Sequence, residues 1–296
     1  MRPHVPLAIV GAGAVAQALG RLLWLRGESV VALASRTLVR AERAAAFIGP
    51  SVQVTTCAEI PRLATRVLVA VSDDAITLVA ETLAQAGMRT GIALHTCGAK
   101  GPEALMPLQA AGVACGMLHP LQTVAGPEQG VDRLRRITFG IAGDRQALDW
   151  AEEIAGLLES RTLYIAAERL SWYHAGAVLA SNALVAAIDA ATRLMERAGI
   201  DRHAALLALE PLSRASLDNV FSGGPGAALT GPIVRGDVGT VVVHLDALRD
   251  APPSVAALYR AVARHLLELA RARGLDEPVV RTLESMIENA KGGERR

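Results

Sequence analysis

A glycine loop lies near the start of the chain, in the segment LAIVGAGAVAQALG. Gly11 permits a tight turn after an apolar run, and Gly13 lets the backbone approach a pyrophosphate, whose charge the start of a helix favours. The small side chain of Ala16 allows that helix to pack closely. Because the loop follows a predicted strand and opens a predicted helix, it predicts a dinucleotide site. The contacts are assigned to Gly11, Ala12, Gly13, Ala14 and Val15.

The residues after the second apolar run distinguish the two nicotinamide dinucleotides. Enzymes that use NAD usually place Asp or Glu there to hold the ribose 2′-hydroxyl, but this chain has ASRT at residues 34–37. Ser35 offers a hydrogen bond, and the Arg36 guanidinium can bind a 2′-phosphate through two hydrogen bonds. Arg40 and Arg43 follow on the next predicted helix. The pattern favours NADP over NAD, although Arg36 at a helix start is also compatible with a solvated side chain.

Polar side chains follow the fourth, fifth and sixth apolar runs. In open α/β sheets, ligands bind beyond the carboxyl ends of the strands. His95, Thr96 and His119 are therefore candidates for lining a nicotinamide pocket, although either histidine alone is equally compatible with a structural role. Asp74 is expected to cap the following helix. The cofactor contacts predicted at these ends are Val71, Ser72, Asp73, His95 and Thr96.

A polar stripe marks the first long helix of the second half. His174, Ser181 and Asn182 have the i, i+7, i+8 spacing that places side chains on one face. Polar groups on an otherwise apolar helix need partners or a wet cleft. The stripe is therefore either helix–helix hydrogen bonding in a core or one wall of the nicotinamide site, with His174 as proton donor.

The segment ALTGPIVRGD, residues 228–237, is also dense in polar and turn-forming residues. Thr230 can donate or accept a hydrogen bond. Arg235 can bind a substrate carboxylate, or it can pair with Asp237 or a neighbouring acid. Asp237 is expected to cap a helix that begins near Val238.

The predicted secondary structure that positions these residues changes along the chain, from alternating strands and helices to helices alone. Apolar runs alternate with helical patterns up to residue 165, which predicts a doubly wound, mostly parallel sheet in an α/β Rossmann domain over residues 1–165. Helical periodicity dominates afterwards and predicts an all-α domain over residues 166–296.

The predicted strands are Leu7–Val10, Val30–Ala34, Val52–Thr55, Val67–Val71, Ile92–His95, Val113–Leu118, Ile137–Ala142 and Thr162–Ile165. The predicted helices include Val15–Arg26, Thr37–Ile48, Ala75–Ala86, Ser171–Ala198, Arg202–Val220, Val238–Leu248, Val255–Arg273 and Pro278–Ala290. Expected N-caps are Asp201 and Ser254, expected helix stops are Gly199 and Gly274, and Ser222–Gly236 is predicted to be an ordered loop.

Composition excludes several classes of protein. Hydrophobic residues make up 51% of the 296 positions, which argues against disorder. With 30 basic and 29 acidic side chains, no basic face for nucleic acid is implied. The three cysteines show no metal or disulfide spacing, so we expect no metal and a reducing, cytoplasmic location. The six residues before the first strand are too few for a secretory signal. The apolar stretch Ala175–Ala191 is interrupted by polar residues and is expected to be a buried helix rather than a membrane span.

Six motifs together resemble a known family: GAGAVA, AVSDDAI, HTCGA, LHPLQT, YHAGAVLASN and LTGPIVRGD. Over nearly its whole length the chain resembles Rossmann-like oxidoreductases that carry a C-terminal domain of unknown function 2520. It is similar in architecture to ketopantoate reductases, pyrroline-5-carboxylate reductases and 6-phosphogluconate dehydrogenases. The resemblance implies a nicotinamide cofactor and a helical domain, of the 6-phosphogluconate dehydrogenase-like type, that covers the cofactor cleft and commonly forms the dimer.

One departure from the ketopantoate reductases concerns the proton donor. They resemble this layout but use a lysine on the first helix of the second domain. The two lysines of this chain, Lys100 and Lys291, lie elsewhere. His174 is the candidate replacement, with Asn182 holding the substrate oxygen or nitrogen.

These observations predict an NADP-dependent reductase acting on CH-OH or CH-NH groups. The cofactor would supply hydride to a small substrate that carries a carboxylate, either a 2-oxo acid such as ketopantoate or an imine, and a side chain would supply the proton. A homodimer through the helix Ser171–Ala198 is expected, because that helix is apolar around much of its circumference. The alternative is a non-catalytic NADP-binding redox sensor. Predicted catalytic residues are His174 first, then His119, with Asn182; predicted substrate contacts are Ser181, Thr230 and Arg235.

Overall fold

The computed structural model describes residues 5–289. Two compact units divide the chain, Met1–Ser181 and Asn182–Arg296, and the division falls inside one long helix. The strands are β1 (Leu7–Val10), β2 (Val30–Ala34), β3 (Gln53–Thr55), β4 (Arg66–Val69), β5 (Ile92–His95), β6 (Ala114–Pro120), β7 (Thr138–Gly143) and β8 (Arg161–Tyr164). The α-helices of the first unit are α1 (Ala14–Leu25), α2 (Leu38–Ile48), α3 (Ile60–Leu63), α4 (Ile76–Gln85), α5 (Met106–Ala110), α6 (Pro127–Arg133), α7 (Arg145–Leu157) and the start of α8 (Leu170–Arg197).

One eight-stranded sheet forms the first unit, in the order β3-β2-β1-β4-β5-β6-β7-β8. Every neighbouring pair is parallel except β6 and β7, which are antiparallel. The doubly wound, mostly parallel sheet is therefore confirmed. Strand order reverses direction after β3-β2-β1, so the carboxyl ends of β1 and β4 flank the point where a ligand crevice is expected.

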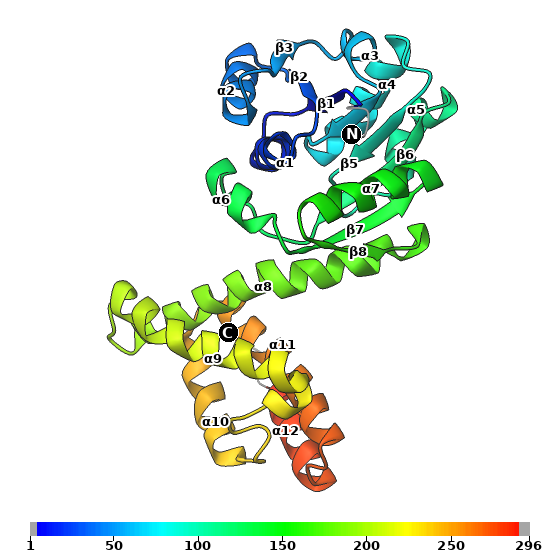
Figure 1. Ribbon diagram of the computed structural model, residues 1–296. Coiled ribbons are helices and arrows are strands. Elements are labelled where there is room, and N and C mark those ends of the chain that lie inside the picture. The colour runs from blue at the N-terminus through cyan, green and yellow to red at the C-terminus, as the bar shows by residue number, and fades with distance from the viewer. Residues whose placement is uncertain (1–4, 290–296) are drawn as a thin grey trace, which may run out of the picture. The chain divides into compact units, whose positions relative to one another are not determined.

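Helices cover both faces of this sheet, with α1, α2, α6 and α7 on one face and α3, α4 and α5 on the other (Figure 1). The alternation of side chains along β1 shows why its sequence is apolar throughout. Leu7 and Ile9 join the core with α1, α2 and α7, whereas Ala8 and Val10 join the core with α3, α4 and α5. A strand buried on both faces needs apolar residues at consecutive positions.

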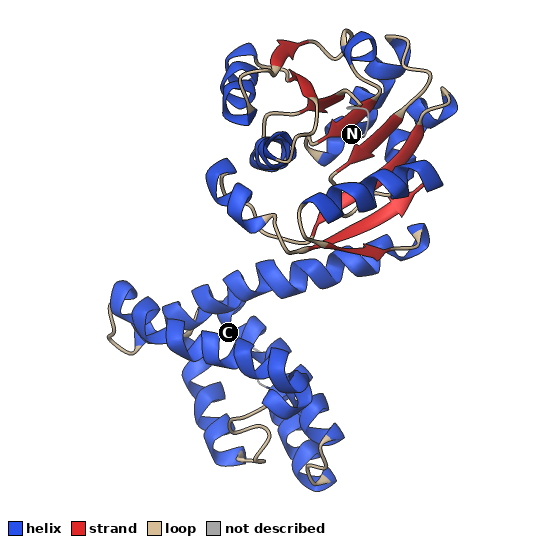
Figure 2. Cartoon of the chain, viewed as in Figure 1, coloured by secondary structure: helices blue, strands red, loops and turns tan. Residues whose placement is uncertain are grey.

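The second unit contains only helices among the residues that the structure describes (Figure 2). Its helices are the remainder of α8, α9 (Arg202–Ala228), α10 (Val238–Ala247), α11 (Pro253–Ala272) and α12 (Glu277–Asn289). The predicted end of the last helix, Ala290, lies outside the described residues. Asp201 and Asp237 cap α9 and α10 through backbone N–H groups, and the expected helix stops Gly199 and Gly274 adopt positive φ of 86° and 92°.

Three local expectations are wrong. The segment Ser222–Gly236 is not a loop throughout, because α9 continues to Ala228 across a break at Gly224, where φ is 81°. The N-cap of α11 is Pro252 rather than Ser254, since the helix begins earlier with Pro253 at its first position. Asp74 lies inside the short 3₁₀ turn Asp73–Ala75 and forms no side-chain cap.

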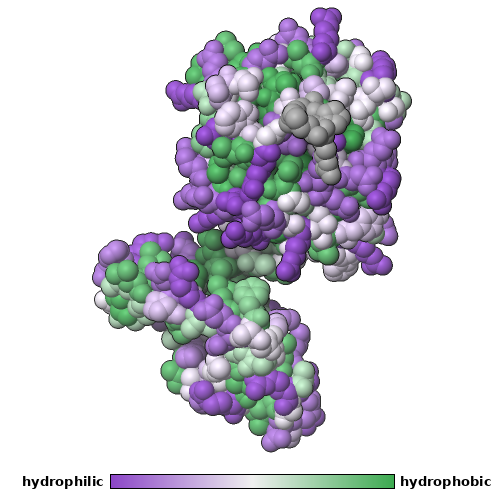
Figure 3. Space-filling view, in the orientation of Figure 1, coloured by the Kyte–Doolittle hydropathy of each residue, from purple (hydrophilic) through white to green (hydrophobic). Residues whose placement is uncertain are grey.

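Helix α8 is formed as predicted but is not buried within the chain. Leu179 and Val185 are 70% and 71% exposed. Figure 3 shows apolar side chains gathered on the surface of the helical part. In the described residues, Ala167–Arg197 is the one helix with the length and hydropathy of a membrane span, a test that core helices of soluble proteins also pass. Within the described chain, only 6% of the most apolar window of this helix is buried, so the burial expected for it is not provided by residues 5–289 themselves.

Candidate functional site

A cavity of about 610 Å³ opens at the carboxyl ends of β1, β2, β4 and β5 in the first unit. All the cofactor contacts predicted from sequence line it except Asp73 and His95. The predicted residues that line the cavity are Gly11, Ala12, Gly13, Ala14, Val15, Ser35, Arg36, Val71, Ser72 and Thr96.

The glycine loop fits a close backbone approach for two different reasons. A Cβ on Gly11 would lie 2.0 Å from the Ala70 carbonyl oxygen, and its φ is +126°, so no other residue fits there. A Cβ on Gly13 would meet no atom within 4 Å, so this glycine leaves open space at the start of α1. Gly13 is the N-cap of α1 and no side chain caps the helix. The first N–H groups of α1 are thus available for an anion.

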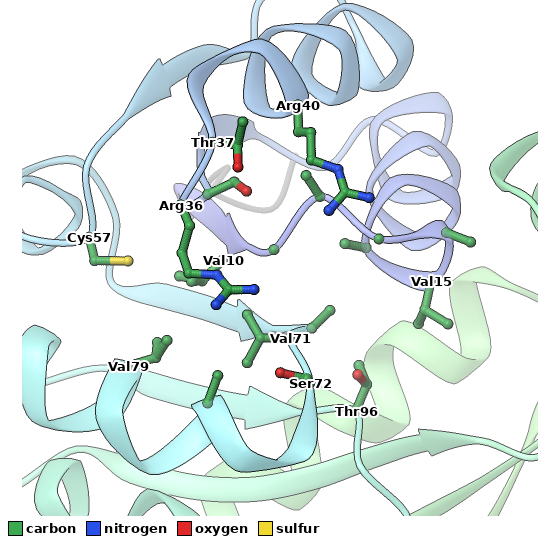
Figure 4. Close-up of a pocket in the computed structure, with 18 of the residues that line it drawn as sticks. Val10, Val15, Arg36, Thr37, Arg40, Cys57, Val71, Ser72, Val79 and Thr96 are labelled. Atoms are coloured by element: carbon green, nitrogen blue, oxygen red, sulfur yellow. The ribbon is translucent and has the colours of Figure 1, made fainter.

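Two arginines and no carboxylate line the cavity beyond β2. Arg36 and Arg40 are exposed and point their guanidinium groups into the cavity (Figure 4), where Thr37 also lies. Among residues 5–289, neither arginine forms an ion pair. Their charge is therefore left for a ligand. Ser72 and Thr96 lie across the cavity from Arg40 (Figure 4).

A second cluster of polar groups lies at the end of β6 and the start of α8. The Tyr173 hydroxyl lies 2.8 Å from Nδ1 of His119, with the two rings edge to face. The His174 ring centroid lies 5.9 Å from that of His119. Burial and the neighbouring His174 lower the pKa of His119 to about 4, and burial raises the pKa of Tyr173 to about 12. Two candidate histidines are therefore brought together, and at neutral pH His119 is an uncharged imidazole.

Neither His95 nor Asp73 lines the cavity. His95 is fully buried, with Nε2 lying 2.9 Å from the Gly101 carbonyl oxygen, so it is part of the core below the site. Burial lowers its pKa. The Asp73 carboxylate raises the pKa of both His95 and His119, which places its charge near the histidine cluster rather than on the cavity wall.

The remaining predicted residues lie at or beyond the unit boundary. The Ser181 hydroxyl donates to the Ala177 carbonyl of its own helix, at 2.8 Å. Asn182 follows on α8, two turns after His174. Thr230 and Arg235 are exposed in the connection between α9 and α10, and the charge of Arg235 contributes to lowering the pKa of Asp237. Within residues 5–289, no group of three or more His, Cys, Asp or Glu is arranged to hold a metal ion.

Sequence reasoning missed two features of the site. Cys57, which follows β3, lines the cavity with Leu78, Val79 and Thr82 of α4. The strand-end rule that located Ser72 and Thr96 would have found Cys57. Tyr173 gave no comparable signal, because its contact with His119 joins β6 to α8 across 54 positions of sequence.

Comparison with known proteins agrees with this description. A parallel sheet with a glycine loop at its switch point defines a Rossmann-like domain, and the model of that domain matches residues 1–120. The model of the domain of unknown function 2520 matches residues 137–266. The chain thus joins a Rossmann-like domain to a domain of unknown function 2520. No curated protein matches the chain in sequence.

Several solved structures share the fold. Protein TM1727 from Thermotoga maritima is 24% identical, with a TM-score of 0.70, covering 90% of this chain and 99% of its own. An imine reductase from Pseudomonas sp. is 16% identical, with a TM-score of 0.63, covering 98% and 100%. A reductive aminase from Aspergillus terreus, solved with NADPH and ethyl-5-oxohexanoate, is 16% identical, with a TM-score of 0.58, covering 97% and 94%. At these identities the likeness shows the fold alone.

Proposed function

We propose that this protein is an NADP-dependent reductase that acts on a C=O or C=N group of a small substrate. The observation that carries the proposal is the cavity itself, with a glycine loop at one end and two free arginines after β2. His119, near the end of β6, lies beside His174 at the start of α8. Solved structures of the same fold include the reductive aminase with NADPH and a pyrroline carboxylate reductase from Plasmodium falciparum with NADP bound.

The residues of the cavity fit NADP. The open space at Gly13 and the uncapped start of α1 suit the pyrophosphate. Ser35, Arg36 and Arg40 suit the 2′-phosphate, because guanidinium groups bind phosphate oxygens through charge-assisted hydrogen bonds. Ser72 and Thr96 would line the nicotinamide end.

The chemistry divides between the cofactor and the chain. When bound, NADPH supplies a hydride to the substrate carbon and leaves as NADP⁺. A histidine at the end of β6 or the start of α8, His119 or His174, gives a proton to the substrate oxygen or nitrogen as the double bond becomes single. Asn182 orients the reacting group. Ser181, Thr230 and Arg235 contact the substrate, with Arg235 binding a carboxylate. Both a 2-oxo acid such as ketopantoate and an imine remain open as substrates.

Domain roles and assembly follow from the same proposal. Residues 1–165 would bind the cofactor, and residues 166–296 would bind substrate and form a cytoplasmic homodimer. The support is the exposed apolar surface of α8 and α9, where Leu212 and Phe221 are 64% and 85% exposed in the single chain. Sedimentation of a monomer at micromolar concentration would contradict the dimer, and a requirement for detergent would point to a membrane instead.

Cofactor choice is tested by replacing Arg36. Arg36→Asp should weaken NADPH about 10- to 100-fold, since a charge-assisted hydrogen bond contributes roughly 1.5–3 kcal/mol, and should leave NADH affinity nearly unchanged. Arg43→Asp is the matched control, because Arg43 is exposed on α2 and does not line the cavity. Isothermal titration measures the affinities of the unchanged protein and of both variants for NADPH and for NADH. Equal binding of NADH and NADPH to the unchanged protein would refute the NADP preference.

Binding of NADPH in the cavity and oxidation of NADPH by a substrate need separate measurements. Cys97 and Cys115 are buried, whereas Cys57 is half-buried at the cavity wall, so NADPH should slow alkylation of Cys57. NADPH oxidation is then followed with a panel of 2-oxo acids and cyclic imines. Protection of Cys57 without oxidation of NADPH by any member of the panel would favour a non-catalytic sensor.

A further inference from the structure

The hydroxyl of Tyr173 connects α8 to two strands of the sheet. Its oxygen packs against Gly140 on β7, where a Cβ would lie only 2.4 Å from it. It also lies 2.8 Å from Nδ1 of His119, whose backbone pairs with Gly140 across β6 and β7. One hydroxyl therefore packs against the backbone of β7 and meets one particular nitrogen of an imidazole on β6.

Two glycines leave room for this arrangement. A Cβ on Gly140 would lie 2.4 Å from the Tyr173 hydroxyl oxygen, and a Cβ on Gly98 would lie 2.6–2.7 Å from three atoms of the His119 ring. Neither glycine has positive φ. Close packing, rather than an unusual backbone, thus requires glycine at both positions. Gly98 packs against the His119 ring and Gly140 packs against the Tyr173 hydroxyl, so both groups are held in place.

The hydrogen bonds determine where the protons lie. A phenol oxygen has one hydrogen to donate. Among the described residues, Nδ1 of His119 is the polar atom within hydrogen-bond distance of the hydroxyl, so the hydroxyl hydrogen is given to Nδ1. Nδ1 then carries a lone pair, and the proton of the neutral imidazole lies on Nε2. The depressed pKa of His119 and the raised pKa of Tyr173 agree with a neutral imidazole beside a neutral phenol.

We propose that Tyr173 is a positioning residue that holds His119 in the Nε2–H tautomer. His119 then gives its Nε2 proton to the substrate oxygen or nitrogen while Nδ1 takes the Tyr173 hydroxyl proton, so that the imidazole stays neutral, and the phenolate regains a proton from water. This inference rests on the proposed reductase function and selects between its two histidines. Nδ1 of His174 is buried and has no hydrogen-bond partner among the described residues, so no contact there fixes its tautomer. The groups that face His119 are Tyr173, His174, Asp73 and His95.

The chain provides a matched control. The Tyr259 hydroxyl on α11 lies 2.9 Å from Nδ1 of His244 on α10, with the rings again edge to face. This second pair lies in the helical unit, and its histidine is exposed. Tyr259→Phe removes the same type of contact without touching the cavity or the His119 cluster.

Nitrogen NMR of the histidine side chains tests the tautomer directly, without turnover. In the unchanged protein at neutral pH, Nδ1 of His119 should be unprotonated and Nε2 protonated, with assignment by the signals lost in His119→Gln. In Tyr173→Phe the Nδ1 resonance should move as its hydrogen bond is lost, whereas Tyr259→Phe should move only the His244 signals. A proton on Nδ1 of His119 in the unchanged protein would overturn the proposal.

Single-turnover hydride transfer tests the positioning role. Tyr173→Phe should slow transfer at least tenfold and leave NADPH affinity unchanged, whereas Tyr259→Phe should change neither; thermal midpoints verify that both variants are folded. An unchanged transfer rate in folded Tyr173→Phe would overturn the role of Tyr173. If the unchanged protein transfers no hydride to any carbonyl or imine, the reductase function fails and the proposed role fails with it, while the NMR result still decides the tautomer.

Discussion

The two tyrosine–histidine pairs of this molecule have almost the same geometry and very different surroundings. Tyr173 and His119 are joined at 2.8 Å, with ring centroids 5.6 Å apart and planes at 90°. Tyr259 and His244 are joined at 2.9 Å, with centroids 6.0 Å apart and planes at 88°. The first pair lies near the end of the interior strand β6, against Gly98 and Gly140, and the second joins helices α10 and α11.

The difference shows that a contact does not by itself define a chemical role. The first pair is desolvated and faces another imidazole, and these two effects lower the pKa of His119 to about 4. A neutral imidazole with a fixed tautomer is a ready hydrogen-bond donor. The second pair has an exposed histidine, so water competes for every hydrogen bond it forms.

The largest expected effect is on turnover. His119→Gln should slow single-turnover hydride transfer by about 10²–10⁴-fold, the usual contribution of a positioned proton donor. His244→Gln should leave the rate unchanged, and NADPH affinity should be unchanged in both. His174→Ala should slow transfer less than His119→Gln does. If His174→Ala gives the larger loss of rate, the proton donor is His174. The Tyr173–His119 pair then has no more catalytic role than the Tyr259–His244 pair.

The next largest expected effect is on stability in acid, which should depend on the first tyrosine–histidine pair and not on the second. The folded pKa of His119 is about 4 and its unperturbed value is 6.5, so below pH 6.5 the unfolded chain binds a proton that the folded chain does not. Stability is therefore lost as pH falls from 6.5 toward 4, by about 3 kcal/mol at most. His119→Gln should make this slope shallower but not flat, because burial also lowers the pKa of His95.

Urea unfolding at pH 4.5, 5.5 and 6.5 measures the slope. His244→Gln is the control for the loss of an imidazole. An unchanged slope in His119→Gln would show that this imidazole is not buried in its neutral form. Asp73 and His174 also face the ring, so the variant should be compared at constant ionic strength.

The same contrast explains what could be predicted from the sequence. Strands β1, β2 and β5 were predicted to the residue, because runs of consecutive apolar side chains bounded by polar ones mark doubly covered strands. The glycine loop that lines the cavity was predicted because all its residues are contiguous. The continuation of α9 to Ala228 was missed because glycine and proline favour a loop locally, and only the break at Gly224 reflects that preference.

The His119–Tyr173 contact joins residues that are 54 positions apart. It depends on the register of β6 with β7 and on the entry of α8, and neither has a signature in a single sequence. The burial of His95 was missed for the same reason, since a histidine at a strand end gives no sign of which way its ring turns.

Packing around the first pair should be intolerant of a single methyl group. Gly140→Ala and Gly98→Ala should each destabilise the protein by about 1–3 kcal/mol, the usual cost of overpacking, because each Cβ overlaps the pair. Gly156→Ala is the control: a Cβ there meets no atom within 4 Å, and the change should stabilise α7 by roughly 0.5–1 kcal/mol. Equal stability of all three variants would mean that the pair is loosely held.

The smallest expected effect is that of Tyr259→Phe on stability. A net intramolecular hydrogen bond contributes about 0.5–1.5 kcal/mol, whereas a buried group left unsatisfied costs about 1–3 kcal/mol. Loss of the Tyr259 hydroxyl leaves an exposed His244 whose nitrogen can bind water instead. The loss of stability in Tyr259→Phe should therefore be about 0.5 kcal/mol or less. Tyr173→Phe leaves Nδ1 of the largely buried His119 without its donor, so its cost should be larger. The urea midpoints of the two variants, measured side by side at pH 7, give the difference. Equal costs would mean that water reaches Nδ1 of His119 as freely as it reaches His244, and the fixed tautomer would then have no structural basis.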